Sequence, residues 1–159
     1  MATIKSLTGA GWLKDADDNF AAINAELAYT TGLHVTKFTF DTAANDATSP
    51  TPVSNKTVAA HPLAVTIPDN AIVISGHVDV ITAVTSEGAA TVAIGLVSGV
   101  DLLAATAKTS LGLAAQVPMA AVKTAPIKLA AEKAVTVTVG TAALTAGKFD
   151  GYIVWMEGA

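Results

Sequence analysis

Four oxygen-bearing residues near the N-terminus have the spacing of a calcium-binding loop. Positions one, three, five and twelve of that loop correspond to Asp15, Asp17, Asn19 and Glu26. Position six needs a sharp turn and favours glycine, but the sequence has Phe20 there. Carboxylates are also typical of the first turn of a helix, where they cap backbone amides and interact favourably with the helix dipole. We therefore interpret these residues as the start of a helix and predict no calcium site.

A second candidate is the pair His77 and Asp79. These residues lie two positions apart in a predicted strand, so their side chains point to the same face, which we expect to be the outer one. Such a pair can supply two metal ligands or an oriented base, but a metal site needs further ligands. The remaining histidines, His34 and His61, lie in segments whose position relative to this strand the sequence does not define. A solvated polar face is the simpler interpretation, and we predict no metal and no cofactor.

Other sequence signatures of catalysis are absent. The chain has no Gly-x-Ser-x-Gly, no His-Glu-x-x-His, no phosphate-binding loop and no cysteine. None of its four glutamates is paired locally with an aspartate in an apolar strand, as a glycosidase would suggest. We predict that the protein is not an enzyme, and we keep as an alternative a hydrolase whose site is assembled from distant loops.

The composition argues against further classes of function. The formal net charge is −4, and all nine basic residues are lysines. An acidic chain without arginine lacks both the counterion-release term and the planar guanidinium groups on which nucleic-acid binding relies. No stretch of about 18 uninterrupted apolar residues occurs, and residues 1–11 lack the apolar core of a signal peptide. We predict synthesis in a cytoplasm with no nucleic-acid or membrane partner, so the sequon beginning at Asn55 is expected to be uninformative.

The first element expected to position these residues is a helix at residues 15–28, before the helix breaker Gly32. Its apolar residues recur at spacings of three and four, the pattern of a helix that packs lengthwise against another surface. They are Leu13, Ala16, Phe20, Ile23 and Leu27. Such a helix can close a threefold axis or dock on a partner. The alternative is that it covers one end of the β domain.

Residues 63–156 alternate apolar with polar or small side chains, which is the pattern of half-buried strands. We expect two hairpins, one from residues 72–84 to 91–97 and one from residues 134–139 to 149–156. The inward positions are expected to be Ile72, Ile74, Val78, Val80, Val92, Ile94, Leu96, Val135, Val137 and Val139.

Three regions follow from these patterns. Residues 1–40 are expected to be an N-terminal helical and anchoring segment plus the first strand, residues 41–62 a flexible linker rich in turn formers, and residues 63–159 the β domain. Within that domain, residues 152–156 are apolar on both faces, which indicates a central strand or an interface strand. Residues 106–125 are Ala-rich and weakly patterned, and they are predicted to be a loop with a short helix.

Four stretches carry a strand pattern that is similar to that of one family: residues 67–80, 89–95, 126–129 and 134–147. In these stretches the chain resembles the small structural proteins of tailed-bacteriophage virions, of the head-decoration, cement or head-fibre type. The resemblance implies a jelly-roll-like antiparallel β-sandwich. Together with the helix expected from the apolar spacing, this predicts a mainly β fold with a short N-terminal helix. The resemblance also implies trimeric assembly on the capsid shell, an anchoring N-terminal segment and no catalytic residues.

We therefore expect a virion protein on the capsid surface that binds the shell of major capsid protein as a homotrimer and stabilises it. We expect the trimer seam or shell anchor to be formed by an apolar stripe, and one aromatic residue to lie at an interface or in the core. The stripe is Leu13, Phe20, Ile23 and Leu27, and the aromatic residue is Trp155.

The alternative is a tail-associated or fibre-associated domain that binds a host glycan or receptor through its loops. Sugar sites commonly combine aromatic platforms with clustered Asn and Asp side chains. The loops of this chain carry few aromatic residues, which argues against a sugar site. The polar loop residues concerned are Asn45, Asp46, Asn55 and Asp101.

Overall fold

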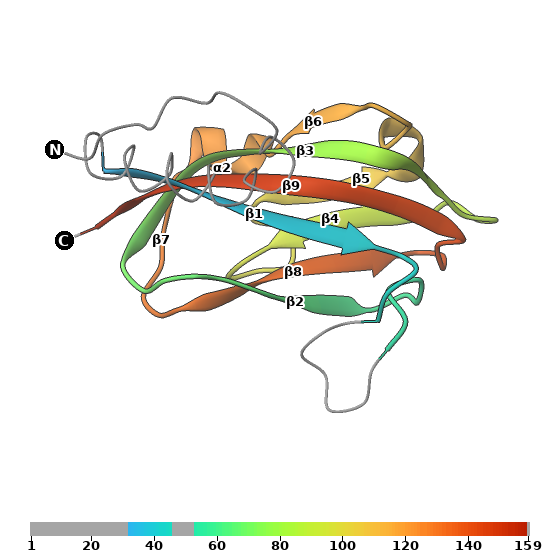
Figure 1. The fold of residues 1–159 in the computed structure, drawn as a ribbon, viewed down its shortest axis with the longest axis horizontal. Helices are drawn as coiled ribbons and strands as arrows, with labels where there is room; N and C mark the ends of the chain where they lie inside the picture. The colour runs from blue at the N-terminus through green and yellow to red at the C-terminus, as the bar shows by residue number, and fades with distance from the viewer. Residues whose placement is uncertain (1–31, 46–52, 159) are drawn as a thin grey trace, which may run out of the picture. The chain divides into compact units, whose positions relative to one another are not determined.

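The computed structural model describes residues 32–45 and 53–158, which form two antiparallel β-sheets (Figure 1). The first sheet has strand order β1-β9-β3-β6, with β7 also paired to β3. The second sheet has strand order β2-β8-β4-β5. The first sheet consists of β1 (Leu33–Asp41), β3 (Ala71–Thr85), β6 (Gln116–Pro118), β7 (Ile127–Lys128) and β9 (Ala146–Glu157). The second consists of β2 (Ala60–Ile67), β4 (Thr91–Gly95), β5 (Leu103–Ala107) and β8 (Lys133–Gly140). The 3-10 helix η1 (Lys108–Ser110) and the helix α2 (Ala120–Thr124) lie in sequence between β5 and β7.

One apolar core lies between the two sheets, so the described part of the chain is a β-sandwich. In the first sheet Phe40 stacks on Phe149, with ring centroids 5.1 Å apart. Phe38 lies against Gly151, where a Cβ atom would come within 2.0 Å of the ring, so this position has no room for a side chain. Aliphatic side chains of the second sheet complete the core, and burial of this apolar surface is the main force that holds the sheets together.

The predicted alternation is confirmed in β8, and the predicted inward positions are confirmed in β4. Val135, Val137 and Val139 are buried, and so are Val92 and Ile94. β9 lies between β1 and β3, which agrees with the central-strand alternative for residues 152–156.

In β3 the predicted inward face is only partly right. Val78 and Val80 are buried, but Ile72 and Ile74 are half-buried, and Val73 takes the core position instead. The reason is a β-bulge: Val73 pairs with Trp155, and Ser75 pairs with the next residue back along β9, so Ile74 is an extra residue. An inserted residue reverses the inward-outward phase of the strand.

Both predicted hairpins are wrong. β3 lies in the first sheet and β4 in the second, and β8 lies in the second and β9 in the first, so each connection crosses between the sheets. Turn-forming residues indicate that the chain reverses direction, but they do not specify whether the next strand joins the same sheet.

The sandwich also begins earlier in the sequence than residue 63. β1 belongs to the first sheet, and β2 begins at Ala60, so parts of the expected N-terminal segment and linker are strands of the sandwich. Residues 106–125 do contain short helices, η1 and α2, together with the strand β6, which the sequence pattern did not predict. The predicted helix at residues 15–28 lies outside the described residues.

Candidate interaction sites

Of the five residues predicted at an interface or anchor, only one lies within the described residues. Trp155, in β9, is 8% exposed, and its indole N–H donates a hydrogen bond to Thr36 Oγ1 at 2.8 Å. Its contact with a neighbouring subunit stays a prediction. The other four residues, Leu13, Phe20, Ile23 and Leu27, lie outside the described residues, as do the four residues with calcium-loop spacing.

His77 and Asp79 do share one face of β3, as the period of two predicts, because Val78 between them is buried. Their side chains have separate contacts. His77 stacks on Tyr152 with ring centroids 5.0 Å apart, and Asp79 accepts a hydrogen bond from the side-chain amide of Gln116. Across residues 32–45 and 53–158, no three or more His, Asp or Glu side chains are grouped so that they could hold a metal ion.

Asn55, the first residue of the sequon, is a structural residue. It is 3% exposed, and its side-chain amide donates a hydrogen bond to the backbone oxygen of Asp41 at 3.0 Å. Its backbone N–H donates to Ala44 O at 3.2 Å. These bonds join the loop before β2 to the residues at and just after the end of β1. Because Asn55 is buried there, it is inaccessible to glycosylation in the folded protein.

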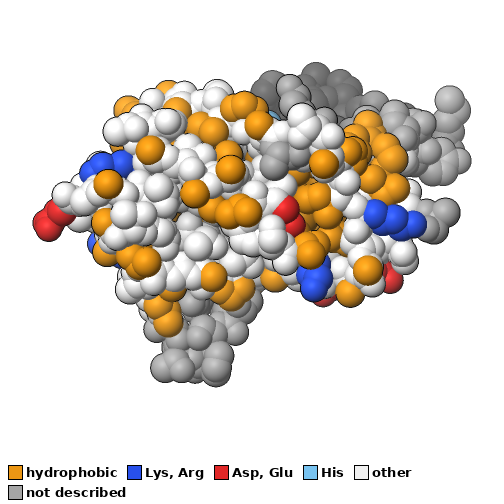
Figure 2. All heavy atoms as spheres, turned by 180° about the vertical axis from the view of Figure 1, so that it is seen from behind, with side chains coloured by type: hydrophobic (Ala, Val, Ile, Leu, Met, Phe, Trp, Pro, Cys, Tyr) orange, Lys and Arg blue, Asp and Glu red, His pale blue; other side chains and the backbone are white. Residues whose placement is uncertain are grey.

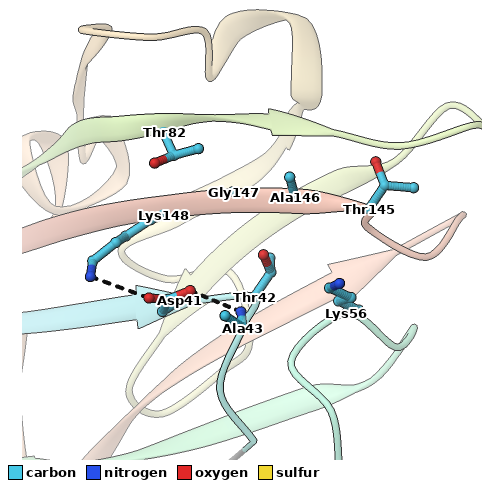
Figure 3. Close-up of a pocket in the computed structure, with 9 residues that line it drawn as sticks. All are labelled: Asp41, Thr42, Ala43, Lys56, Thr82, Thr145, Ala146, Gly147 and Lys148. Carbon is cyan, nitrogen blue, oxygen red and sulfur yellow. Dashed lines mark hydrogen bonds and ion pairs between the residues drawn. The ribbon is translucent and has the colours of Figure 1, made fainter.

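A pocket of about 300 Å³ opens beside Asn55, at the end of β1 (Figure 3). Four separate segments line it: the end of β1, the loop before β2, the strand β3, and the start of β9. Figure 3 shows the side chain of Lys148 directed toward Asp41, and Lys56 on the loop before β2. Within the part of the chain that the structure describes, the lining residues are Asp41, Thr42, Ala43, Lys56, Thr82, Thr145, Ala146, Gly147 and Lys148.

Asp41 is the electrostatic centre of this pocket. One carboxylate oxygen accepts the backbone N–H of Ala43 at 2.8 Å, and the other lies 3.2 Å from Lys148 Nζ. The hydrogen bond from Ala43, followed by the bond and charge of Lys148, lowers the pKa of Asp41, because these contacts outweigh the smaller effect of burial. Asp41 is therefore ionised at neutral pH and its charge is matched by Lys148.

A second ion pair lies further along the same two strands. Lys37 Nζ is 2.9 Å from Asp150 Oδ2, and the Thr39 hydroxyl donates to Asp150 Oδ1 at 2.6 Å. Burial opposes ionisation of Asp150, but the hydrogen bonds from Thr39 and Lys37 outweigh it, so the net effect is a lowered pKa.

The loop between β4 and β5 presents a different kind of surface. Asp101 accepts the backbone N–H groups of Leu96, Val97 and Ser98 at 2.8, 2.9 and 2.9 Å. The loop nevertheless exposes apolar side chains, since Val97 is 62% exposed and Val100 is 50% exposed.

The back of the molecule carries few charges. Figure 2 shows apolar side chains scattered among uncharged polar ones on that face, with only isolated lysine and acidic side chains. Within the described residues, none of the helices has the length and apolar character needed to cross a membrane.

Sequence reasoning missed the pocket. It considered the polar loop residues as glycan ligands, but Asn55 binds the backbone at the end of β1 and Asp101 binds the backbone of its own loop. Lys56 and Lys148 are far apart in the sequence, and no motif indicates a ligand-binding role for either. The only local signal was the turn-forming sequence that follows Asp41, which is consistent with the Ala43 hydrogen bond.

Comparison with known proteins gives matches at the level of the fold. No protein-family model matches the chain, and no curated protein matches it in sequence. Three solved structures match in fold, and all three are phage capsids. One chain comes from the acidic stable capsid of Helicobacter pylori bacteriophage KHP30, with a TM-score of 0.55, 13% identity, and coverage of 80% of this chain and 89% of that chain.

The other two matches are of the same kind. A chain of the capsid of Ralstonia phage GP4 has a TM-score of 0.50 and 19% identity, with 79% of this chain and 85% of that chain covered. A chain of the cyanophage Pam1 capsid asymmetric unit has a TM-score of 0.51 and 13% identity, with 79% and 84% covered. At these identities the matches establish a common fold, a β-sandwich that is found in phage capsids.

Proposed function

We propose that this protein is a structural component of a phage virion, a decoration or cement protein that binds the outer surface of the head shell as a homotrimer and stabilises it. The observation that carries the proposal is the shared fold. About four-fifths of this chain covers 84–89% of three chains from phage capsids. Those chains are therefore close to this chain in length, and the likeness extends over nearly the whole of each.

The strand order supports a jelly roll as the particular type of sandwich. Two four-stranded paths, β1-β9-β3-β6 and β2-β8-β4-β5, face each other. The chain passes from one sheet to the other at each step from β1 to β4 and from β7 to β9, and β5 pairs with β4, as in nested Greek keys. Jelly rolls are recurrent in viral capsid domains, where a compact sandwich exposes loops at both ends for contacts with neighbours.

The mechanism is mechanical and needs no reacting group. A subunit that binds across neighbouring shell proteins opposes their separation under the outward pressure of a packaged genome. Many copies that each bury a standard interface of about 1,600 Å² would reinforce the shell by the sum of modest contacts. Two surfaces are available for these contacts: the loop containing Val97, which exposes apolar side chains, and the pocket beside Asp41, which is lined by charged and polar ones.

The test is the solution mass of the purified chain together with its binding to phage heads that lack it. We expect a particle of three times the 15.9 kDa chain mass and saturable binding in a sedimentation assay. A monomer would contradict the homotrimer, and absence of saturable binding would contradict the decoration role.

The predicted seam can be tested in the same assays. Phe20→Asp places a charge in the apolar stripe, so it is expected to reduce the particle to a single-chain mass and to weaken head binding at least tenfold, because an unpaired charge in an apolar interface costs several kcal/mol. Phe20→Leu keeps the position apolar and serves as the control. If Phe20→Asp changes neither mass nor binding, the seam lies elsewhere.

A further inference from the structure

We propose that the pocket beside Asp41 binds a carboxylate group, and that its occupant in the virion is an acidic side chain of a neighbouring shell protein. The identity of the partner rests on the proposed function. The chemistry of the pocket rests on its own residues.

The charge of the pocket favours an anion. Among the described residues, its lining contains two ammonium groups, on Lys56 and Lys148, and one carboxylate, on Asp41. Lys148 is matched with Asp41, whose two oxygens are both in use. Within residues 32–45 and 53–158, no acidic side chain pairs with Lys56. A positive charge is therefore left over in the pocket, in a chain whose overall charge is negative.

The position of Lys56 is fixed by its backbone. Its carbonyl oxygen accepts the N–H of Leu144 at 2.8 Å, and the preceding residue, Asn55, is buried and hydrogen-bonded to the end of β1. On the other side of the pocket, the N–H of Thr42 donates to Gly147 O at 3.0 Å, which joins β1 to the start of β9. The backbone positions of the two lysines are thus set at the same pocket before any ligand arrives, which lowers part of the entropic cost of binding.

Hydroxyl groups complete the lining. Thr42, Thr82 and Thr145 line the same pocket, and each carries a hydroxyl that can donate to an oxyanion. Thr145 is steadied by a 2.8 Å hydrogen bond to the hydroxyl of Thr85. A planar carboxylate can accept from an ammonium group and a hydroxyl at the same time.

The size of the pocket favours a side chain of a protein over a larger ligand. Its volume of about 300 Å³ is at the small end of the range of ligand pockets, about 300–1,000 Å³. It lies where β1 ends and β9 begins, beside the loop before β2 (Figure 3). A single such contact is weak, but a symmetric shell repeats it many times.

The experiment is a nuclear magnetic resonance titration of the ¹⁵N-labelled full chain with an end-blocked triglutamate peptide, with the triglutamine peptide as the neutral ligand. We expect triglutamate alone to shift the amide signals of residues 42, 56, 82 and 145–148. Lys56→Gln is expected to weaken this binding about threefold to fivefold, as for one exposed ion pair. Lys133→Gln, at the opposite end of the second sheet, makes the same charge change and is expected to have no effect.

Equal weakening by Lys56→Gln and Lys133→Gln would mean general charge attraction and would overturn the pocket proposal, as would the absence of shifts at these residues. Binding of each variant to phage heads then tests the partner. Loss of head affinity in Lys56→Gln but not in Lys133→Gln supports an acidic shell contact, and unchanged head affinity overturns that assignment. If the wild-type chain does not bind heads at all, the decoration role is contradicted. The peptide titration still tests whether the pocket binds a carboxylate.

Discussion

At one end of the sandwich, Asp101 holds the loop between β4 and β5 through three backbone amides, whereas at the other end Asp41 holds the pocket segments through one amide and a lysine. The loop that Asp101 holds follows Gly95, whereas Thr91 at the other end of β4 is opposite Gly140, and Leu144, in the loop after β8, donates its backbone N–H to the pocket residue Lys56. Asp101 fixes a loop that exposes Val97 and Val100. Asp41 fixes a polar pocket with a surplus ammonium group.

An aspartate side chain thus stabilises two different kinds of contact surface. A carboxylate that binds only backbone amides determines the shape of a loop and leaves its side chains free to be apolar. A carboxylate that shares its charge with a lysine links strands and leaves the surface ionic. Stability is therefore expected to depend strongly on the β4–β5 loop and only weakly on the ion pair, because exposed ion pairs contribute little.

The largest effect is expected from Gly95→Ala at the end of β4. A Cβ atom at Gly95 would lie 1.7 Å from the carbonyl oxygen of Ser98, which belongs to the backbone and cannot move aside without opening the loop. We expect a loss of about 3 kcal/mol or more in the free energy of unfolding, measured by denaturant titration. Gly112→Ala is the control, since nothing lies within 4 Å of a Cβ atom there. Equal stabilities of the two variants would show that the loop accommodates a Cβ atom at residue 95 without a loss of stability.

A smaller effect is expected from Asp101→Ala. Three amide N–H groups lose their acceptor, although solvent can reach two of them, so we expect a loss of about 2–3 kcal/mol. Asp101→Asn keeps one acceptor oxygen and is expected to lose less. Faster hydrogen exchange at Leu96, Val97 and Ser98 should accompany the loss in Asp101→Ala. Unchanged exchange at these amides would contradict the role of Asp101.

The sequence predicted the core positions of some strands better than those of others. The unbroken alternation in β8 was enough to assign Val135, Val137 and Val139 to the core. In β3 the extra residue Ile74 reversed the phase, and a bulge depends on the partner strand, which the sequence does not name.

The two ends of the sandwich were harder to predict for a related reason. The connections after β3 and β8 pass from one sheet to the other, and the turn residues there are the same as those of a hairpin. Lys56 and Lys148 come together only through that topology. Asp101 was recognised as a polar loop residue, but its amide bonds depend on the local path of the loop.

The smallest effect is expected at Asp41, and it should depend on pH. The hydrogen bond from Ala43 and the charge of Lys148 lower the pKa of Asp41 in the folded state below its ordinary value of 3.8. Ionised Asp41 therefore stabilises the fold above the ordinary pKa, and this contribution is lost as the pH falls through the lowered value. Because both partners are substantially exposed, we expect Asp41→Asn to cost less than about 1 kcal/mol at pH 7 and still less at pH 3. Denaturant titrations of both proteins at the two pH values measure this difference. An equal cost at both would mean that folding does not lower the pKa of Asp41, and the contrast between a carboxylate bound only to backbone amides and one in an ion pair would no longer hold.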